Sequence, residues 1–157
     1  MYRKVMNMDR PLKWHKFLIY VALWITALGY LIRGASMVFV GLTEYVDNPF
    51  FQHPAIKTLN VVYGVIFIAY AVYNVYVRYQ LARFRKDAPK KLLLTYILYP
   101  VLELAYTPIA LLVIGAPASL IFSAKFVGSI IGAVIAIAIL YIPTNIYYNK
   151  RAELFIN

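Results

Sequence analysis

Residues 126–148 read FVGSIIGAVIAIAILYIPTNIYY and contain no charged side chain. A helix needs about 20 mainly apolar residues to cross the roughly 30 Å hydrocarbon core of a bilayer. Three further segments are comparably long and apolar, at about residues 17–40, 59–77 and 92–115. We therefore predict an all-α polytopic membrane protein, with four transmembrane helices in one left-handed or irregular bundle and a single membrane domain over residues 1–157.

Two of these segments leave an alternative open. The third contains Pro100 and Pro108, so we expect a kinked helix there, and a re-entrant segment would instead give three spans. The first follows a basic start and includes Gly34-Ala35-Ser36, which is weakly compatible with a cleaved signal peptide. Its apolar stretch is long for a signal peptide and favours a retained helix.

The composition excludes several other classes of protein. The chain has 157 residues, of which 63% are hydrophobic and 14% charged. Soluble domains average roughly 45–50% apolar and about 25% charged residues. These values exclude an ordinary soluble domain and a disordered chain, and the absence of cysteine excludes a disulfide scaffold.

The basic residues alternate between the ends of the predicted spans. Of the 16 Lys and Arg, five lie in residues 1–16, six in the linker 78–91 and two after Tyr148, which places 13 on one side. Because Lys and Arg in short loops stay cytoplasmic, both termini and the linker 78–91 are predicted to be cytoplasmic. The net charge of +10 also invites a nucleic-acid partner, but this alternation favours membrane topology and no nucleic acid.

The linker 78–91 is the predicted contact with membrane lipids. Basic residues near an anionic leaflet contribute about 1 kcal/mol each to binding. The side chains expected to contact anionic headgroups are Arg83, Arg85, Lys86, Lys90 and Lys91.

Two ionisable residues fall inside the predicted spans. Arg33 lies about 24 Å from the inner end of the first span, and Glu103 about 17 Å from that of the third, at 1.5 Å per residue. A charge at mid-membrane costs about 2.5–3.5 kcal/mol on insertion scales, so each needs a partner. The difference in depth is within reach of an arginine, and we predict an Arg33–Glu103 contact.

Three polar stripes at helical spacing are predicted to converge around this pair. Their members are Ala22, Thr26, Gly29, Arg33 and Ser36; Tyr63, Phe67, Tyr70 and Asn74; and Tyr96, Tyr99, Glu103 and Tyr106. Such groups commonly serve as hydrogen-bonded packing contacts between membrane helices. The alternative is a polar ligand cavity or a path for ions or protons, next to a proline-interrupted helix.

The fourth span carries a ridge of small residues. Ala124, Gly128, Gly132 and Ala136 repeat every four residues, a spacing that lets another helix backbone approach closely. We predict a helix-packing contact there, either within the chain or between copies in a homo-oligomer or with a larger membrane partner. The outer linker 41–58 is a further candidate for partner binding.

The sequence lacks the residue patterns of common catalytic sites. His15 and His53 fall on opposite predicted sides of the membrane, and there is no phosphate-binding loop or Gly-x-Ser-x-Gly motif. Glu103 has no accompanying nucleophile at a convincing spacing. We expect no enzyme activity, no metal and no cofactor.

Three stretches resemble a family of small, uncharacterised four-span integral membrane proteins of clostridial-type bacteria. They are residues 12–20 (LKWHKFLIY), 56–64 (IKTLNVVYG) and 145–157 (NIYYNKRAELFIN). Some members carry an N-terminal zinc ribbon, which this cysteine-free chain cannot form. The resemblance implies a bacterial inner-membrane location and carries no catalytic or binding residues over.

Two functional hypotheses follow from these features. The first is a non-catalytic accessory, scaffold or immunity-type membrane protein that acts through helix–helix contacts. The second is a small transporter or channel subunit that uses Arg33, Glu103 and the tyrosine stripes.

Overall fold

The computed structural model describes residues 12–43, 53–117, 119 and 123–156, and these form helices and no strands. Four helical segments are long and apolar enough to cross a membrane: Lys13–Leu42, Pro54–Ala82, Ala88–Val113 and Ala124–Asn149. The prediction of an all-helical protein with four transmembrane helices is therefore confirmed.

The first segment is a composite of three elements. It begins with α1 (Lys13–Phe17), widens into the π-helix η2 (Leu18–Ala22) and continues as α2 (Leu23–Leu42). A single π-turn inside a longer helix shifts the register of its backbone hydrogen bonds and often occurs at functional positions.

The remaining helices begin and end at residues suited to those positions. α4 (Pro54–Ala82) starts with Pro54 after His53, whose side chain accepts a hydrogen bond from the Ala55 amide. α7 (Ala124–Asn149) is capped in the same way by Ser123. The 3₁₀ turn η3 (Ala152–Leu154) follows it.

Helix α5 (Ala88–Val113) runs through both Pro100 and Pro108 as one element. The alternative of a re-entrant third segment is therefore wrong. The helix ends at Val113 and is followed by the C-cap residue Ile114 and by Gly115, which has φ 71°, a left-handed conformation that glycine adopts without steric cost.

The linker between the second and third spans is shorter than predicted. Arg78 belongs to α4, and Lys90 and Lys91 belong to α5, so only residues 83–87 join the two helices. Helix α4 continues from its predicted end at about Val77 to Ala82, and Leu81 in this extension is fully buried, so packing supports the added residues.

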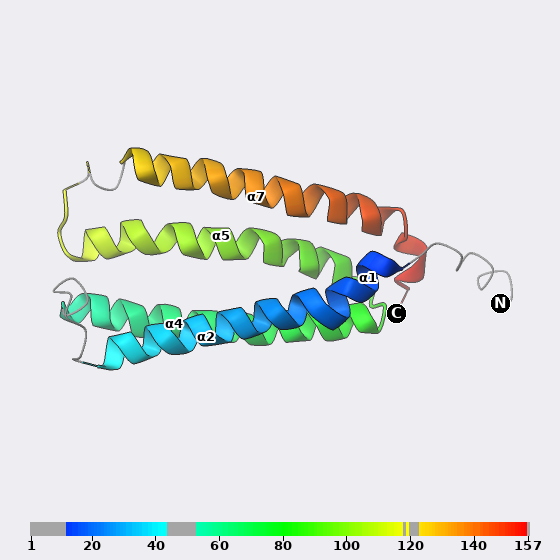
Figure 1. The fold of residues 1–157 in the computed structure, drawn as a ribbon, viewed down its shortest axis with the longest axis horizontal. Helices are drawn as coiled ribbons and strands as arrows, with labels where there is room; N and C mark the ends of the chain where they lie inside the picture. The colour runs from blue at the N-terminus through cyan, green and yellow to red at the C-terminus, as the bar shows by residue number, and fades with distance from the viewer. Residues whose placement is uncertain (1–11, 44–52, 118, 120–122, 157) are drawn as a thin grey trace, which may run out of the picture.

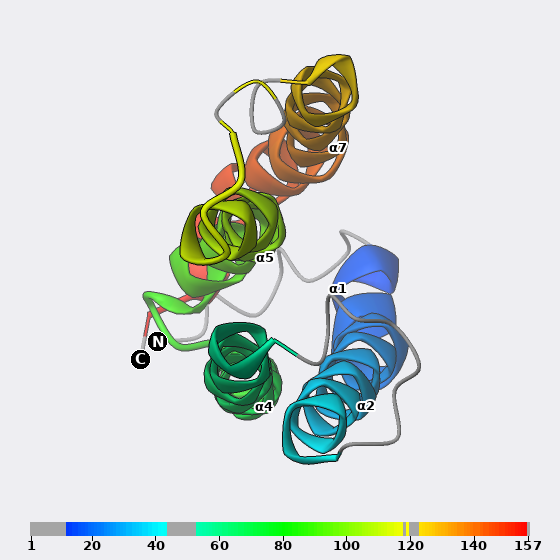
Figure 2. The same ribbon diagram turned by 90° about the vertical axis from the view of Figure 1, so that its left-hand side faces the viewer.

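The four long helices pack in chain order and form an irregular bundle. Viewed along the helices, α2 lies beside α4, α4 beside α5 and α5 beside α7 (Figure 2). The contact between α2 and α4 is the most extensive. The most apolar stretch is buried within the chain to the greatest extent in α4, whereas none of that of α7 is buried.

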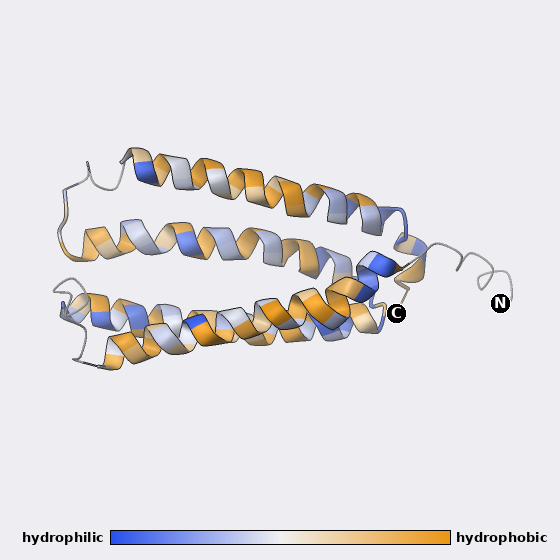
Figure 3. Cartoon of the chain, in the orientation of Figure 1, coloured by the Kyte–Doolittle hydropathy of each residue, from blue (hydrophilic) through white to orange (hydrophobic). Residues whose placement is uncertain are grey.

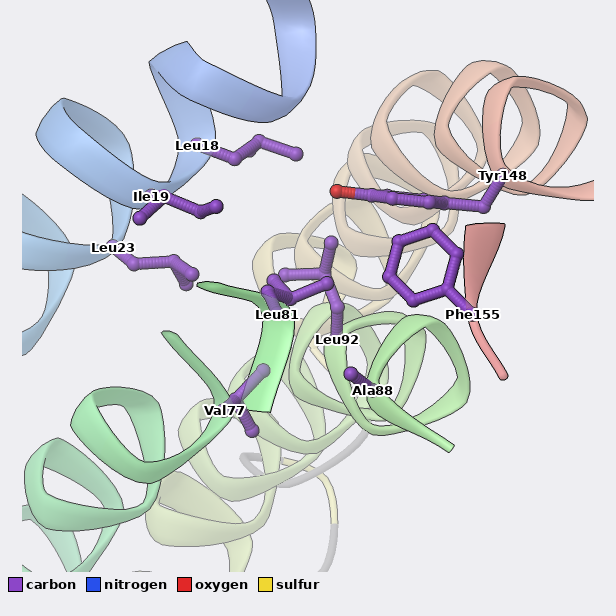
Figure 4. Close-up of a cluster of buried hydrophobic side chains, with 9 residues drawn as sticks. All are labelled: Leu18, Ile19, Leu23, Val77, Leu81, Ala88, Leu92, Tyr148 and Phe155. Carbon is purple, nitrogen blue, oxygen red and sulfur yellow. The ribbon is translucent and has the colours of Figure 1, made fainter. Parts of the chain in front are cut away.

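The main apolar core lies at one end of the bundle. Side chains from η2, α2, α4, α5, α7 and the C-terminal tail meet there (Figure 4). Leu81, Ala88 and Leu92 are fully buried at its centre, and Phe155 of the tail covers it next to Tyr148. This end therefore joins the first segment, the α4–α5 linker and the tail.

Most of the described basic residues lie at the same end (Figures 1 and 3). They are Lys13, Lys16, Arg78, Arg83, Arg85, Lys86, Lys90, Lys91, Lys150 and Arg151. Lys57 and Lys125 lie near the opposite end, where α4 and α7 begin. The predicted separation of charge thus holds for the described residues; Arg3, Lys4 and Arg10 lie outside them, as do residues 44–52 of the outer linker 41–58.

Candidate functional site: a polar seam between α2, α4 and α5

Arg33 of α2 and Glu103 of α5 form a salt bridge, as the helix registers predict. Arg33 Nη2 lies 2.6 Å from Glu103 Oε2, and the side chains are 45% and 26% exposed. The guanidinium also lies over the Phe67 ring of α4, 5.1 Å from its centroid. The pair therefore connects three helices, and we call the polar groups around it the polar seam.

The face that α2 presents to its neighbours differs from the predicted stripe. Gly29, Arg33 and Ser36 are exposed, whereas Leu23, Ala27, Gly34 and Gly41 are buried. The residues through which α2 contacts its neighbours are therefore small or apolar, and not the polar ones. An added Cβ at Gly34 would lie 2.6 Å from the carbonyl oxygen of Gly64 in α4. Close backbone packing decides the rotation of α2, and Arg33 reaches Glu103 from the side.

The predicted stripe on α4 is buried. Tyr63, Phe67, Tyr70 and Asn74 are each at most 6% exposed. The Tyr70 hydroxyl donates to the Thr95 carbonyl of α5 at 2.5 Å, and Asn74 Nδ2 donates to the Tyr70 carbonyl at 2.8 Å. These bonds fasten α4 to α5 and satisfy the Asn74 amide within its own helix.

The stripe on α5 divides between two neighbours. Tyr96 interacts with the hydroxyl of Thr144 in α7. Tyr99 packs against the Tyr30 ring of α2, with centroids 5.0 Å apart. Tyr106 donates a hydrogen bond from its hydroxyl to Asn60 Oδ1 of α4 at 2.6 Å. Of the residues in the α5 stripe, Tyr99, Glu103 and Tyr106 therefore belong to the polar seam, and Tyr96 does not.

Asn60 was not identified from the sequence, although it is 2% exposed. It lies one turn before Gly64 on the buried face of α4. Its helical spacing from Tyr63, on the same face, is the feature of the sequence that could have identified it. Two buried atoms of the polar seam, Asn60 Nδ2 and Glu103 Oε1, have no hydrogen-bond partner among the described residues. One is a donor and the other an acceptor, and buried polar atoms in proteins normally have such a partner.

A second polar cluster, at the basic end, was also missed. His15 is 2% exposed, and its Nδ1 is hydrogen-bonded to the Tyr148 hydroxyl at 3.0 Å. The rings of Phe84 and Phe155 lie 4.9 and 5.8 Å from the imidazole. These contacts join α1, the α4–α5 linker and the tail, and nothing in the local sequence around His15 indicates them.

The ridge on α7 does not pack against the described part of the chain. An added Cβ at Gly128 or Gly132 would meet nothing within 4 Å, and Ala136 is exposed. The intrachain alternative for this helix-packing contact is therefore wrong, because α7 turns its opposite side, including Thr144 and Tyr148, toward its neighbours. The contact between copies or with another membrane protein stays a prediction.

The predicted lipid-contact residues are spread along the basic end and do not form one pocket. Arg83 lies over the Tyr79 ring at 4.1 Å, and Lys91 Nζ donates to the Tyr76 hydroxyl at 3.0 Å. Arg85, Lys86 and Lys90 are exposed. This arrangement is typical of aromatic and basic residues at a membrane interface.

The described residues contain no group of three His, Asp or Glu side chains placed to hold a metal ion. Comparison with protein-family models, with curated proteins and with solved structures finds no match to this chain. The resemblance to the clostridial-type four-span proteins therefore stays a prediction.

Proposed function

We propose that this chain is a non-catalytic membrane accessory or scaffold protein, of which immunity-type proteins are one class, and that it associates with a second copy through the outer face of α7. The observation that carries the proposal is the open ridge of Gly128, Gly132 and Ala136 on a helix whose apolar stretch has no buried residue. Association of membrane helices is driven by van der Waals packing, which small residues permit by letting backbones approach.

The polar seam supports a structural role for the charged residues. Arg33 and Glu103 neutralise each other, and Tyr70, Asn74 and Tyr106 use their polar groups to bond neighbouring backbone or side-chain atoms. Paired groups of this kind join helices and leave no free acid or base at the pair.

Self-association in liposomes tests the proposal. Because the chain has no cysteine, Lys86→Cys in the exposed linker provides one labelling site for donor and acceptor dyes. Energy transfer between labelled chains should persist on dilution with lipid and should be lost in Gly132→Leu, whose side chain blocks the ridge. Gly29→Leu is the matched control, because Gly29 of α2 is equally open. Equal transfer in both variants would refute association through α7.

The proposed location is a bacterial cytoplasmic membrane with both termini in the cytoplasm. The support is the concentration of basic residues at one end of the bundle. In intact cells, a membrane-impermeant maleimide should label Lys125→Cys and spare Lys86→Cys, and the reverse labelling would overturn this orientation.

The second candidate is a small transporter or channel subunit. It is favoured by one observation, the unpartnered Asn60 Nδ2 and Glu103 Oε1 inside the polar seam. Flux of protons, ions or small solutes into liposomes that falls in Glu103→Gln would support it. An absence of flux in both the parent and Glu103→Gln would leave the scaffold proposal as the account of this protein.

A further inference from the structure

The π-helix η2 holds an arginine from α4. The Nε of Arg78 donates a hydrogen bond to the Ile19 carbonyl, 3.2 Å away, inside the widened turn. The same guanidinium lies over the Trp24 ring, 5.0 Å from its centroid. Ile19 and Val77, the neighbour of Arg78, are both buried in the core at this end (Figure 4). The position of the arginine is thus fixed by backbone, ring and core together.

These contacts use only part of the guanidinium. Arginine carries five N–H donors, and the Ile19 carbonyl accepts one of them. Within the described residues the one salt bridge is that of Arg33 and Glu103, so no described carboxylate neutralises Arg78. Among the described residues, no anion pairs with the two Nη groups of Arg78, although the helices of this chain are long and apolar enough to lie in lipid. A cation near the hydrocarbon edge is stabilised when its side chain reaches the interface, where anionic headgroups can neutralise it.

The surroundings of Arg78 identify the source of that charge. Arg78 lies four residues before the end of α4, about 6 Å along the axis, at the basic end of the bundle. Trp24 is 47% exposed on the outside of α2, where the neighbouring molecules in a membrane are lipids. Tryptophan is enriched at this level of membrane proteins because its ring packs on lipid while its N–H meets the headgroups.

We propose that Arg78 and Trp24 form a binding site for the phosphate of an anionic phospholipid. The two Nη groups bind two phosphate oxygens, a bidentate geometry that guanidinium matches well. The Ile19 carbonyl and the Trp24 ring orient the guanidinium before the lipid binds. Arg83, on the next turn of the same chain segment, adds positive potential that favours a headgroup with net negative charge. The site does not depend on association through α7.

Trp24 itself reports on its lipid neighbours. The chain has two tryptophans, so Trp14→Phe leaves Trp24 as the only one. This variant is placed in two sets of vesicles with the same mixture of phosphatidylglycerol and phosphatidylcholine. In one set the phosphatidylglycerol is brominated. In the other set an equal amount of phosphatidylcholine is brominated instead. Greater quenching in the first set measures enrichment of the anionic lipid at Trp24. We expect about fivefold enrichment, which corresponds to about 1 kcal/mol.

Substitutions at Arg78 decide whether the enrichment comes from this site. In the Trp14→Phe background, Arg78→Gln should abolish it, whereas Lys16→Gln should keep it. Both variants lose one positive charge at the basic end, but Lys16 is an exposed residue of α1 that is not among the predicted lipid contacts. Equal enrichment in the two would overturn the proposal. If circular dichroism shows that Arg78→Gln does not fold, Arg78→Lys decides: reduced enrichment supports the guanidinium site, and unchanged enrichment overturns it.

Inorganic phosphate separates a lipid site from a site for soluble anions. Added to the vesicles at constant ionic strength, it should leave the quenching by brominated phosphatidylglycerol unchanged. Loss of that quenching with phosphate, but not with chloride, would assign the site to a water-soluble phosphate and overturn the proposed lipid.

Discussion

The closest packing in this protein, between α2 and α4, gives a quantitative prediction for Gly64→Ala. An added Cβ at Gly64 would lie 2.6 Å from Val38 Cγ2, 2.7 Å from the Gly34 carbonyl oxygen and 2.8 Å from the Val38 amide nitrogen. Two of these atoms belong to the backbone and cannot move aside alone. Restoring ordinary contact requires the helices to separate by about 0.8 Å, a gap at which each contact loses a quarter to a half of its attraction.

The expected cost is about 1–3 kcal/mol in the free energy of unfolding, the range for overpacked interiors. It can be measured by reversible unfolding in mixed micelles with increasing dodecyl sulfate, followed by circular dichroism. Gly29→Ala is the control, since a Cβ there meets nothing within 4 Å. It should leave stability unchanged or raise it slightly, because alanine favours helix by up to about 1 kcal/mol over glycine.

The same contact predicts non-additive behaviour. A Cβ at Gly34 would meet the Gly64 carbonyl oxygen at 2.6 Å, so both substitutions force apart the same pair of backbones. The double variant Gly34→Ala/Gly64→Ala should therefore lose less stability than the sum of the two single losses. A Gly64→Ala protein as stable as Gly29→Ala would refute the close approach of α2 and α4.

Two further substitutions test the polar contacts by the same unfolding measurement. Glu103→Gln should cost about 2–3 kcal/mol, since Arg33 loses its counter-charge inside a span, and exchanging Arg33 and Glu103 should restore most of that loss; an exchanged protein no more stable than Glu103→Gln would contradict the pairing. Tyr148→Phe should cost about 1–3 kcal/mol because the buried His15 ring loses the partner of its Nδ1, whereas Tyr141→Phe, on the same helix with no such bond, should change stability little; equal losses would argue against the His15–Tyr148 bond.

The sequence predicts the spans and the central ion pair because both depend on simple lengths. Four apolar segments of bilayer length leave no polar exterior, and helical rise alone places Arg33 and Glu103 at similar depths. Neither inference needs knowledge of which helices touch.

The rotation of α2 could not be predicted in this way. The polar stripe through Gly29 and Arg33 suggested an inward face, but the buried face follows Gly34 and Gly41, where backbone meets backbone. In lipid, both faces of a helix are apolar, so hydropathy does not show which one packs. Small residues indicate the packing face better than hydropathy does. The ridge on α7 shows, however, that they do not identify the partner that packs there.

The cluster around His15 depends on contacts between distant parts of the chain. Tyr148 and Phe155 lie more than a hundred residues from His15, and they meet it because the helices return to the same end of the bundle. The tail carries only a short apolar run, which has no helical periodicity that would indicate burial. The sequence of such a chain therefore predicts its membrane spans better than it predicts the contacts between the ends of those spans.

Disulfide cross-linking along α7 measures whether two copies associate through the outer face of this helix. Single cysteines are introduced into the cysteine-free chain at Gly128, Gly132 and Ala136, and at the matched lipid-exposed positions Val127 and Val134. After oxidation in native membranes, we predict cross-linked dimers at the three ridge positions and monomers at the two valines. Dimers at the valines, or equal cross-linking at all five positions, would contradict it.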